Sequence, residues 1–171
     1  MPLLRSQLEP VDETVNDLIL AADDRRWEAY ELAVQSRPFA AIYLAGFTVE
    51  MLLKTAGFIV DGAGRGDPIK AKLGPAKNYG GQKFPTIPYE SYHSLRFWAA
   101  FLEHKRTDQG RPLGQALLAE LHARTARASD TWWIEMRYRP SAPSAAIAQA
   151  EVLALLEDVD WFFKSHSQLW S

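Results

Sequence analysis

The sequence contains no cysteine among its 171 residues. This absence excludes disulfide bonds, thiolate catalysis and cysteine-ligated zinc. It is typical of a cytoplasmic protein, which is the location we predict. The first ten residues, MPLLRSQLEP, lack the long apolar region of a secretory signal, so we expect none. The net charge is only −2, which by itself indicates neither an anionic nor a cationic partner.

A long uncharged hydrophobic run is also missing. The most apolar stretch, 38–60, is interrupted by Glu50 and Lys54, and its longest uncharged part, 38–49, has 12 residues. A membrane span needs about 20 apolar residues, and charges within lipid cost several kcal/mol. We therefore predict no contact with a membrane. A helix that is apolar on nearly all sides is instead expected to lie inside a bundle.

Apolar residues at helical spacing predict four more helices around this central one, at 12–35, 92–105, 113–128 and 145–167. The short break before Pro38 predicts that the first two helices form an antiparallel hairpin. Residues 61–90 hold six of the ten glycines and four of the ten prolines, which predicts a long basic loop. The expected fold is all-α, a single domain over 1–171 that forms an antiparallel up-and-down bundle of about five helices.

Charge is distributed unevenly along the chain. Residues 1–60 carry 5 basic and 9 acidic side chains, residues 61–140 carry 13 and 8, and residues 141–171 carry 1 and 4. The basic middle could face an anionic partner such as RNA, or it could pair with the acidic ends. If RNA is the partner, we expect its phosphates to meet six cations, Lys70, Lys72, Lys77, Lys83, Arg96 and Arg111.

Segment 43–54, YLAGFTVEMLLK, resembles the signature helix of HEPN domains, which are small helical bundles. Further matches follow in the family's order: RWEA at 26–29, HSL at 93–95, and Trp133 followed by Arg137 and Tyr138. The resemblance covers residues 15–165. It implies a bundle that commonly forms a homodimer, and a role as an RNA-cleaving toxin or an RNA-binding module. It also implies a nucleotidyltransferase as a frequent partner.

The nucleases of that family carry an arginine, four to six further residues, and then a histidine. None of the four histidines here follows an arginine at that distance, and Arg96 and His104 are separated by seven residues. We therefore predict a non-catalytic RNA- or nucleotide-associated module, of a toxin–antitoxin or defence system. One alternative is an atypical metal-independent RNase toxin that uses Arg137 or Arg139 with His93 or His104. The other alternative is a protein–protein interaction bundle.

Glu50 is a carboxylate in an otherwise apolar part of its helix, and a buried carboxylate needs a partner. We predict a structural ion pair between Glu50 and Arg137, which lies in an aromatic segment. Two alternatives stay open, a role in a binding site and an i, i+4 pair with Lys54. His104 and His122 could come near one another if their helices are antiparallel, but two histidines without an obvious carboxylate ligand are weak evidence for a metal site, and we expect neither metal nor cofactor.

Overall fold

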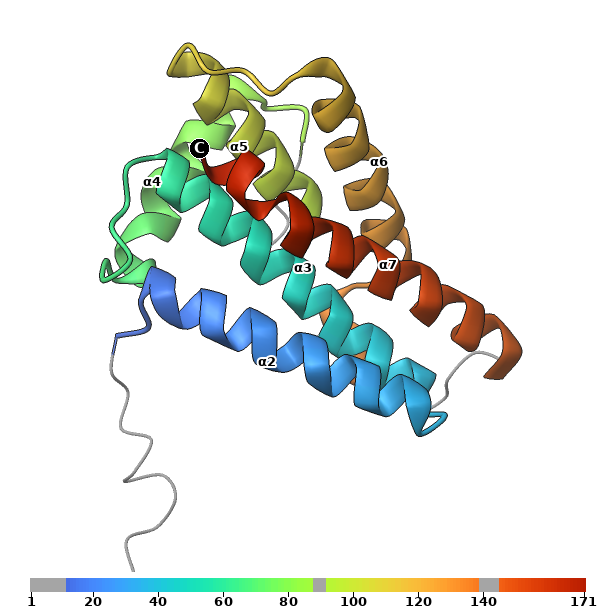
Figure 1. The fold of residues 1–171 in the computed structure, drawn as a ribbon. Coiled ribbons are helices and arrows are strands. Elements are labelled where there is room, and N and C mark those ends of the chain that lie inside the picture. The colour runs from blue at the N-terminus through green and yellow to red at the C-terminus, as the bar shows by residue number, and fades with distance from the viewer. Residues whose placement is uncertain (1–11, 88–91, 139–144) are drawn as a thin grey trace, which may run out of the picture.

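The computed structural model describes residues 12–87, 92–138 and 145–171, and of residues 137, 138 and 145–148 it describes only the backbone. These residues form six α-helices and one 3₁₀-helix and contain no named strand. The all-α prediction is confirmed for this part of the chain. The helices are α2 (Val15–Val34), α3 (Pro38–Val60), α4 (Ile69–Lys83), α5 (Leu95–Asp108), α6 (Gln115–Thr131), η1 (Ile134–Tyr138) and α7 (Ala145–Trp170) (Figure 1).

Helix α3 is the centre of the fold, as its sequence predicts. It begins at Pro38, where the missing N–H of proline costs no helical hydrogen bond. It packs against α2, α5, α6, α7 and η1. Its length and composition would suit a membrane span, but 78% of its most apolar window is buried by the rest of the chain. Such burial is what a core helix shows.

Helices α2 and α3 form the predicted hairpin and lie side by side in opposite directions (Figure 1). Thr14 and Asp17 form a capping box at the start of α2, and its buried face consists largely of the small residues Ala22, Ala29 and Ala33. Between the helices, Ser36 adopts a left-handed φ of 59°, which reverses the chain within three residues. Helix α7 runs beside α3 in the same direction as α3 (Figure 1), whereas alternation of the five expected helices predicts opposite directions for these two.

Helix α4 corrects the prediction of one long loop over 61–90. Its buried residues Ile69, Ala76 and Gly80 recur at helical spacing, and the helix packs against α5. A methyl group at Gly80 would overlap the ring of Phe97, so glycine here permits close helix packing. Tertiary contact thus outweighs the low helix propensity of glycine. With α4 included, the described residues contain six α-helices, against the five expected.

Helix α5 also begins later than expected, at residue 95 instead of 92. Its cap is Ser94, whose Oγ accepts a hydrogen bond from the backbone N–H of Phe97 at 3.3 Å. Ser91, the residue directly before the predicted start of the helix, lies outside the described residues. The shift leaves His93 in the turn before the helix, where its side chain can face a neighbouring element.

Candidate functional site

A pocket of about 370 Å³ lies where the turn before α5, the end of α6 and η1 meet. Its size falls within the range of small-ligand sites, about 300–1,000 Å³. It combines two indole rings, an imidazole and a guanidinium with polar and apolar groups. The lining residues are Ile87, His93, Ser94, Leu95, Arg96, Ser129, Trp132, Trp133, Ile134 and Glu135.

Trp132 forms the fixed inner wall of this pocket. Its side chain is buried, and its Nε1–H donates a hydrogen bond to the carbonyl of Tyr43 at 3.0 Å. The ring lies directly over Gly46 of α3, where a methyl group would overlap the indole. The next residue, Trp133, is 42% exposed. One tryptophan is therefore held by the core, while its neighbour offers a ring to solvent.

His93 is joined to the core through Glu50. The imidazole Nδ1 lies 2.8 Å from Oε2 of Glu50, whose side chain is only 4% exposed, against 36% for His93. Because a carboxylate only accepts hydrogen bonds, Nδ1 donates. The other carboxylate oxygen, Oε1, pairs with Lys54 one turn later on α3. A buried charge pair thus orients an imidazole that lines the pocket.

The predicted pair of Glu50 with Arg137 stays a prediction, because the side chain of Arg137 lies outside the described residues. The structure does show the alternative i, i+4 pair with Lys54. It adds His93, a partner 43 residues away that no spacing in the sequence indicates. A carboxylate at a buried position predicts that a partner exists, but only the packing of α5 on α3 identifies it.

Of the four weak catalytic candidates, the two whose side chains are described, His93 and His104, lie at different places. His93 lines the pocket, whereas the ring of His104 stacks on Phe84 with centroids 5.0 Å apart. Arg139 lies outside the described residues, and the side chain of Arg137 is not described. Within the described part of the chain, no group of three His, Asp or Glu side chains could hold a metal ion.

The six predicted phosphate-binding cations do not form one surface either. Arg96 lies in the first turn of α5 and Arg111 follows its last turn, and the helix itself is about 20 Å long at 1.5 Å per residue. Three of the cations have carboxylate partners: Lys72 with Asp67 at 2.7 Å, Lys83 with Asp108 at 3.0 Å, and Arg96 with Asp130 at 2.8 Å. Arg111 donates to the side chain of Gln109, and Lys70 and Lys77 are exposed on α4. Only Arg96 lines the pocket.

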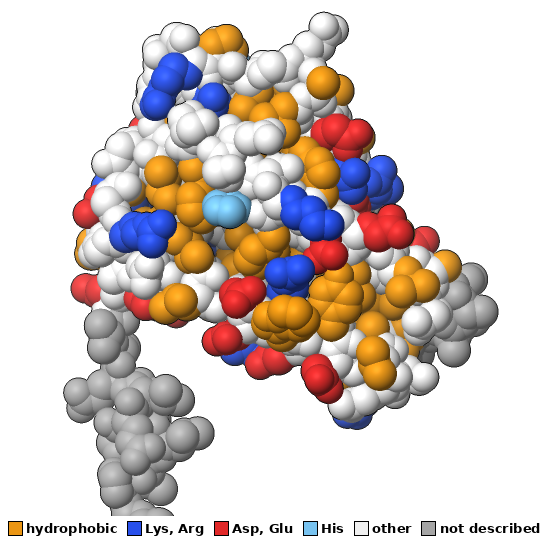
Figure 2. All heavy atoms as spheres, in the orientation of Figure 1, with side chains coloured by type: hydrophobic (Ala, Val, Ile, Leu, Met, Phe, Trp, Pro, Cys, Tyr) orange, Lys and Arg blue, Asp and Glu red, His pale blue; other side chains and the backbone are white. Residues whose placement is uncertain are grey.

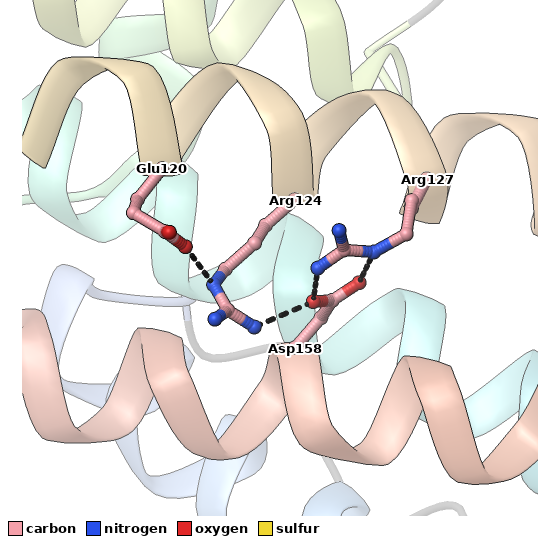
Figure 3. A network of polar contacts seen from close by, with 4 residues as sticks. All are labelled: Glu120, Arg124, Arg127 and Asp158. Carbon is pink, nitrogen blue, oxygen red and sulfur yellow. Dashed lines mark hydrogen bonds and ion pairs between the residues drawn. The ribbon is translucent and has the colours of Figure 1, made fainter. Parts of the chain in front are cut away.

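Basic residues of α6 pair with the acidic last helix. Pairing of the basic middle with an acidic end was one of the two interpretations of the charge distribution. Figure 3 shows Arg124 and Arg127 of α6 directed at Asp158 of α7. Nη1 of Arg124 donates to that carboxylate at 2.8 Å, and Nε of the same guanidinium donates to Glu120. Asp158 is 1% exposed, so the network lies between the helices. Basic and acidic side chains are also interspersed over the face drawn in Figure 2.

A second cluster connects the ends of α4 and α5. Hydrogen bonds from Lys83 and then from Tyr79 lower the pKa of Asp108 below its ordinary value of 3.8. Burial, together with the hydrogen bond to Asp108, raises the pKa of Tyr79 above 10. These pKa shifts arise from contacts between α4 and α5, and none of the three residues lines the pocket.

Sequence reasoning named Trp133 within a motif but did not place Trp132 or Ser129 at a site. A signal was present, because a tryptophan doublet follows the end of a helix while the central helix offers Gly46 as a gap. In comparisons with protein-family models, with curated proteins and with solved structures, nothing matches this chain. The assignment of function therefore depends on the site itself.

Proposed function

We propose that this chain is an HEPN-like, non-catalytic module that binds RNA or a nucleotide in the pocket between α5, α6 and η1. The observation that carries the proposal is the meeting of Trp133, His93 and Arg96 in one pocket. Exposed bases of single-stranded RNA stack on aromatic rings, and arginine meets their phosphates. The resemblance of segment 43–54 to the HEPN signature helix supports the same proposal.

The pocket suits a single nucleotide better than a long duplex. Its aromatic wall offers a stacking face, because Trp133 is part exposed beside the fixed ring of Trp132. Arg96 is exposed and pairs with Asp130, which is exposed as well, so the guanidinium can exchange that partner for a phosphate. Since the other predicted cations are dispersed, they do not form a continuous positive surface that could bind the phosphate backbone of a longer RNA. We therefore expect short contacts with one or two nucleotides.

Fluorescence anisotropy with a labelled single-stranded RNA 12-mer, at several salt concentrations, tests the proposal. We expect binding that weakens with salt and competition by mononucleotides. Removing one stacking ring costs about 1–3 kcal/mol, so Trp133→Ala should weaken binding at least fivefold. Trp27→Ala is the matched control, because Trp27 is exposed on α2, away from the pocket. Undetectable binding at the lowest salt, or an equal loss in both variants, would reject the pocket.

One observation favours a second function, metal-independent RNA cleavage. Glu50 holds Nδ1 of His93 as a donor, the arrangement that orients an imidazole for general-base work at its other nitrogen. In such a reaction the imidazole takes the 2′-hydroxyl proton, the 2′-oxygen bonds to the adjacent phosphorus, and the 5′-oxygen leaves and takes a proton from water. The products would be a 2′,3′-cyclic phosphate and a 5′-hydroxyl.

Incubation of RNA with the pure protein in EDTA decides between binding and cleavage. A cleaving enzyme should lose activity in His93→Gln and keep it in His122→Gln, since His122 lies on α6 outside the pocket. If no cyclic-phosphate product forms above the level of His93→Gln, the non-catalytic function stands.

We also infer from the HEPN resemblance a homodimer, a cytoplasmic location and a nucleotidyltransferase partner in a toxin–antitoxin or defence system. Sedimentation velocity tests the dimer over a range of protein concentrations. Co-purification with the product of an adjacent nucleotidyltransferase gene tests the partner. A concentration-independent monomer would contradict the homodimer.

A further inference from the structure

The outer face of α2 carries an exposed apolar stripe. Leu20, Trp27 and Val34 follow one another at intervals of seven residues and are 58%, 58% and 84% exposed. Residues seven apart lie on the same side of a helix. The buried residues of α2, such as Ala22 and Ala29, lie on the opposite side. The stripe therefore faces away from the core.

A row of carboxylates accompanies the stripe. Asp17, Asp24 and Glu31 repeat at the same interval of seven and are exposed. Among the described residues, neither Asp24 nor Glu31 forms an ion pair, in contrast to the paired cations of α4 to α6. Figure 2 shows carboxylates gathered along the α2 edge of the molecule, with hydrophobic side chains among them. The helix thus presents an apolar line bordered by unneutralised negative charge.

Trp27 at the middle of the stripe is held in place before any partner arrives. The guanidinium of Arg26 lies 5.2 Å from the centroid of Trp27 and 4.7 Å from that of Phe163 on α7. Asp160 anchors the same guanidinium by hydrogen bonds of 2.8 and 3.1 Å. An exposed tryptophan that is already ordered loses little entropy on binding, which is characteristic of interface anchors.

We propose that α2 docks a basic amphipathic helix of a partner protein along Leu20, Trp27 and Val34. Apolar side chains at heptad spacing fit a partner helix with the same repeat, and flanking charges select that helix. The acidic row calls for lysine or arginine beside the partner's apolar positions. This surface is separate from the pocket, so it goes beyond the proposed RNA or nucleotide binding and does not depend on it.

A labelled peptide tests the docking surface on the full chain. The probe is a fluorescein-labelled 21-residue helix with leucine at a and d and lysine at e and g of three heptads. The control peptide has glutamate in place of lysine. We expect the lysine peptide to bind at least tenfold more tightly than the glutamate peptide, with an affinity that falls as salt rises.

Variants locate the site. Leu20→Ser with Val34→Ser should weaken binding tenfold or more, while Leu153→Ser, which removes an equally exposed leucine from α7, should change it less than twofold. Asp24→Asn with Glu31→Gln should weaken binding and flatten its salt dependence. Circular dichroism checks that each variant remains folded.

Three results would overturn the proposal. The first is equal binding of the two peptides, and the second is an equal loss of affinity in Leu153→Ser. The third is a wild-type dimer that Leu20→Ser with Val34→Ser converts to a monomer, because the occupant would then be a second copy of this chain. The RNA titration uses Trp133→Ala, so failure there and failure here are distinguishable.

Discussion

Gly46→Ala should destabilise the protein although alanine is the better helix former. The methyl group would overlap Cγ, Cδ1 and Cδ2 of Trp132, the ring atoms next to its Cβ. A small rotation of the side chain cannot move those atoms away, unlike the far end of a flexible chain. The indole must therefore shift as a unit, and its hydrogen bond to the carbonyl of Tyr43 breaks.

The size of the effect follows from three contributions. Overpacking of a core costs about 1–3 kcal/mol, and the rigid overlap here places it at the upper end. The lost hydrogen bond adds about 1 kcal/mol, and the helix propensity of alanine returns about 1 kcal/mol. We expect a net loss of about 3 kcal/mol in the free energy of unfolding. Full expulsion of the indole would cost more, about 4–6 kcal/mol for 150–250 Å² of buried surface.

Urea denaturation followed by circular dichroism measures this loss. Gly81→Ala is the matched control, because a methyl group there meets nothing within 4 Å and α4 gains helix propensity. It should leave stability unchanged or raise it by up to about 1 kcal/mol. A loss below 1 kcal/mol in Gly46→Ala would refute the packing argument. So would an undiminished loss when Trp132→Leu removes the ring first, since the two sites must couple.

Three further perturbations address the polar contacts. Glu50→Gln leaves the buried ammonium of α3 uncompensated and should cost about 3–5 kcal/mol in urea denaturation, and a loss below 1 kcal/mol would contradict that burial. Asp158→Asn removes the carboxylate that two arginines share and should cost about 3 kcal/mol by the same measurement, and a loss below 1 kcal/mol would contradict the burial of that network. The Lys83 hydrogen bond lowers the pKa of Asp108, so the ionised carboxylate stabilises the fold above pH 3.8, and this stabilisation is lost as the pH falls further. The free energy of unfolding of Asp108→Asn should therefore fall less steeply in acid than that of the wild type.

The sequence predicts an element well where local and tertiary preferences agree. Helix α3 has a proline at its start and apolar residues on every side, so propensity and burial lead to the same bounds. Helix α4 was missed because its glycines and Pro75 argue for a loop, while contact with α5 favours a helix. Two serines three residues apart, Ser91 and Ser94, are equally good caps by type, and only the packing of α5 selects one.

The candidate site was predicted in part for the same reason. A buried carboxylate must have a partner, so the importance of Glu50 follows from its neighbours in the chain. The identity of His93 as a partner does not, because it depends on how α3 and α5 cross. The basic residues were identified by type, but whether they bind a ligand or a carboxylate depends on which helix lies opposite. Arg127 meets Asp158 across 31 residues, a contact that no local pattern encodes.

The charged residues of α3 also determine the rotation of that helix and its position along its axis. The hydrophobic effect is not directional. A helix that is apolar on all sides would therefore lose little free energy of burial if it rotated, or if it slid by one turn, about 5.4 Å, along its groove. Such a slip would separate Glu50 from His93 and leave a carboxylate and an ammonium facing hydrocarbon. Two polar side chains thereby exclude the alternative alignments that the surrounding apolar surface would tolerate, and the fold has one register.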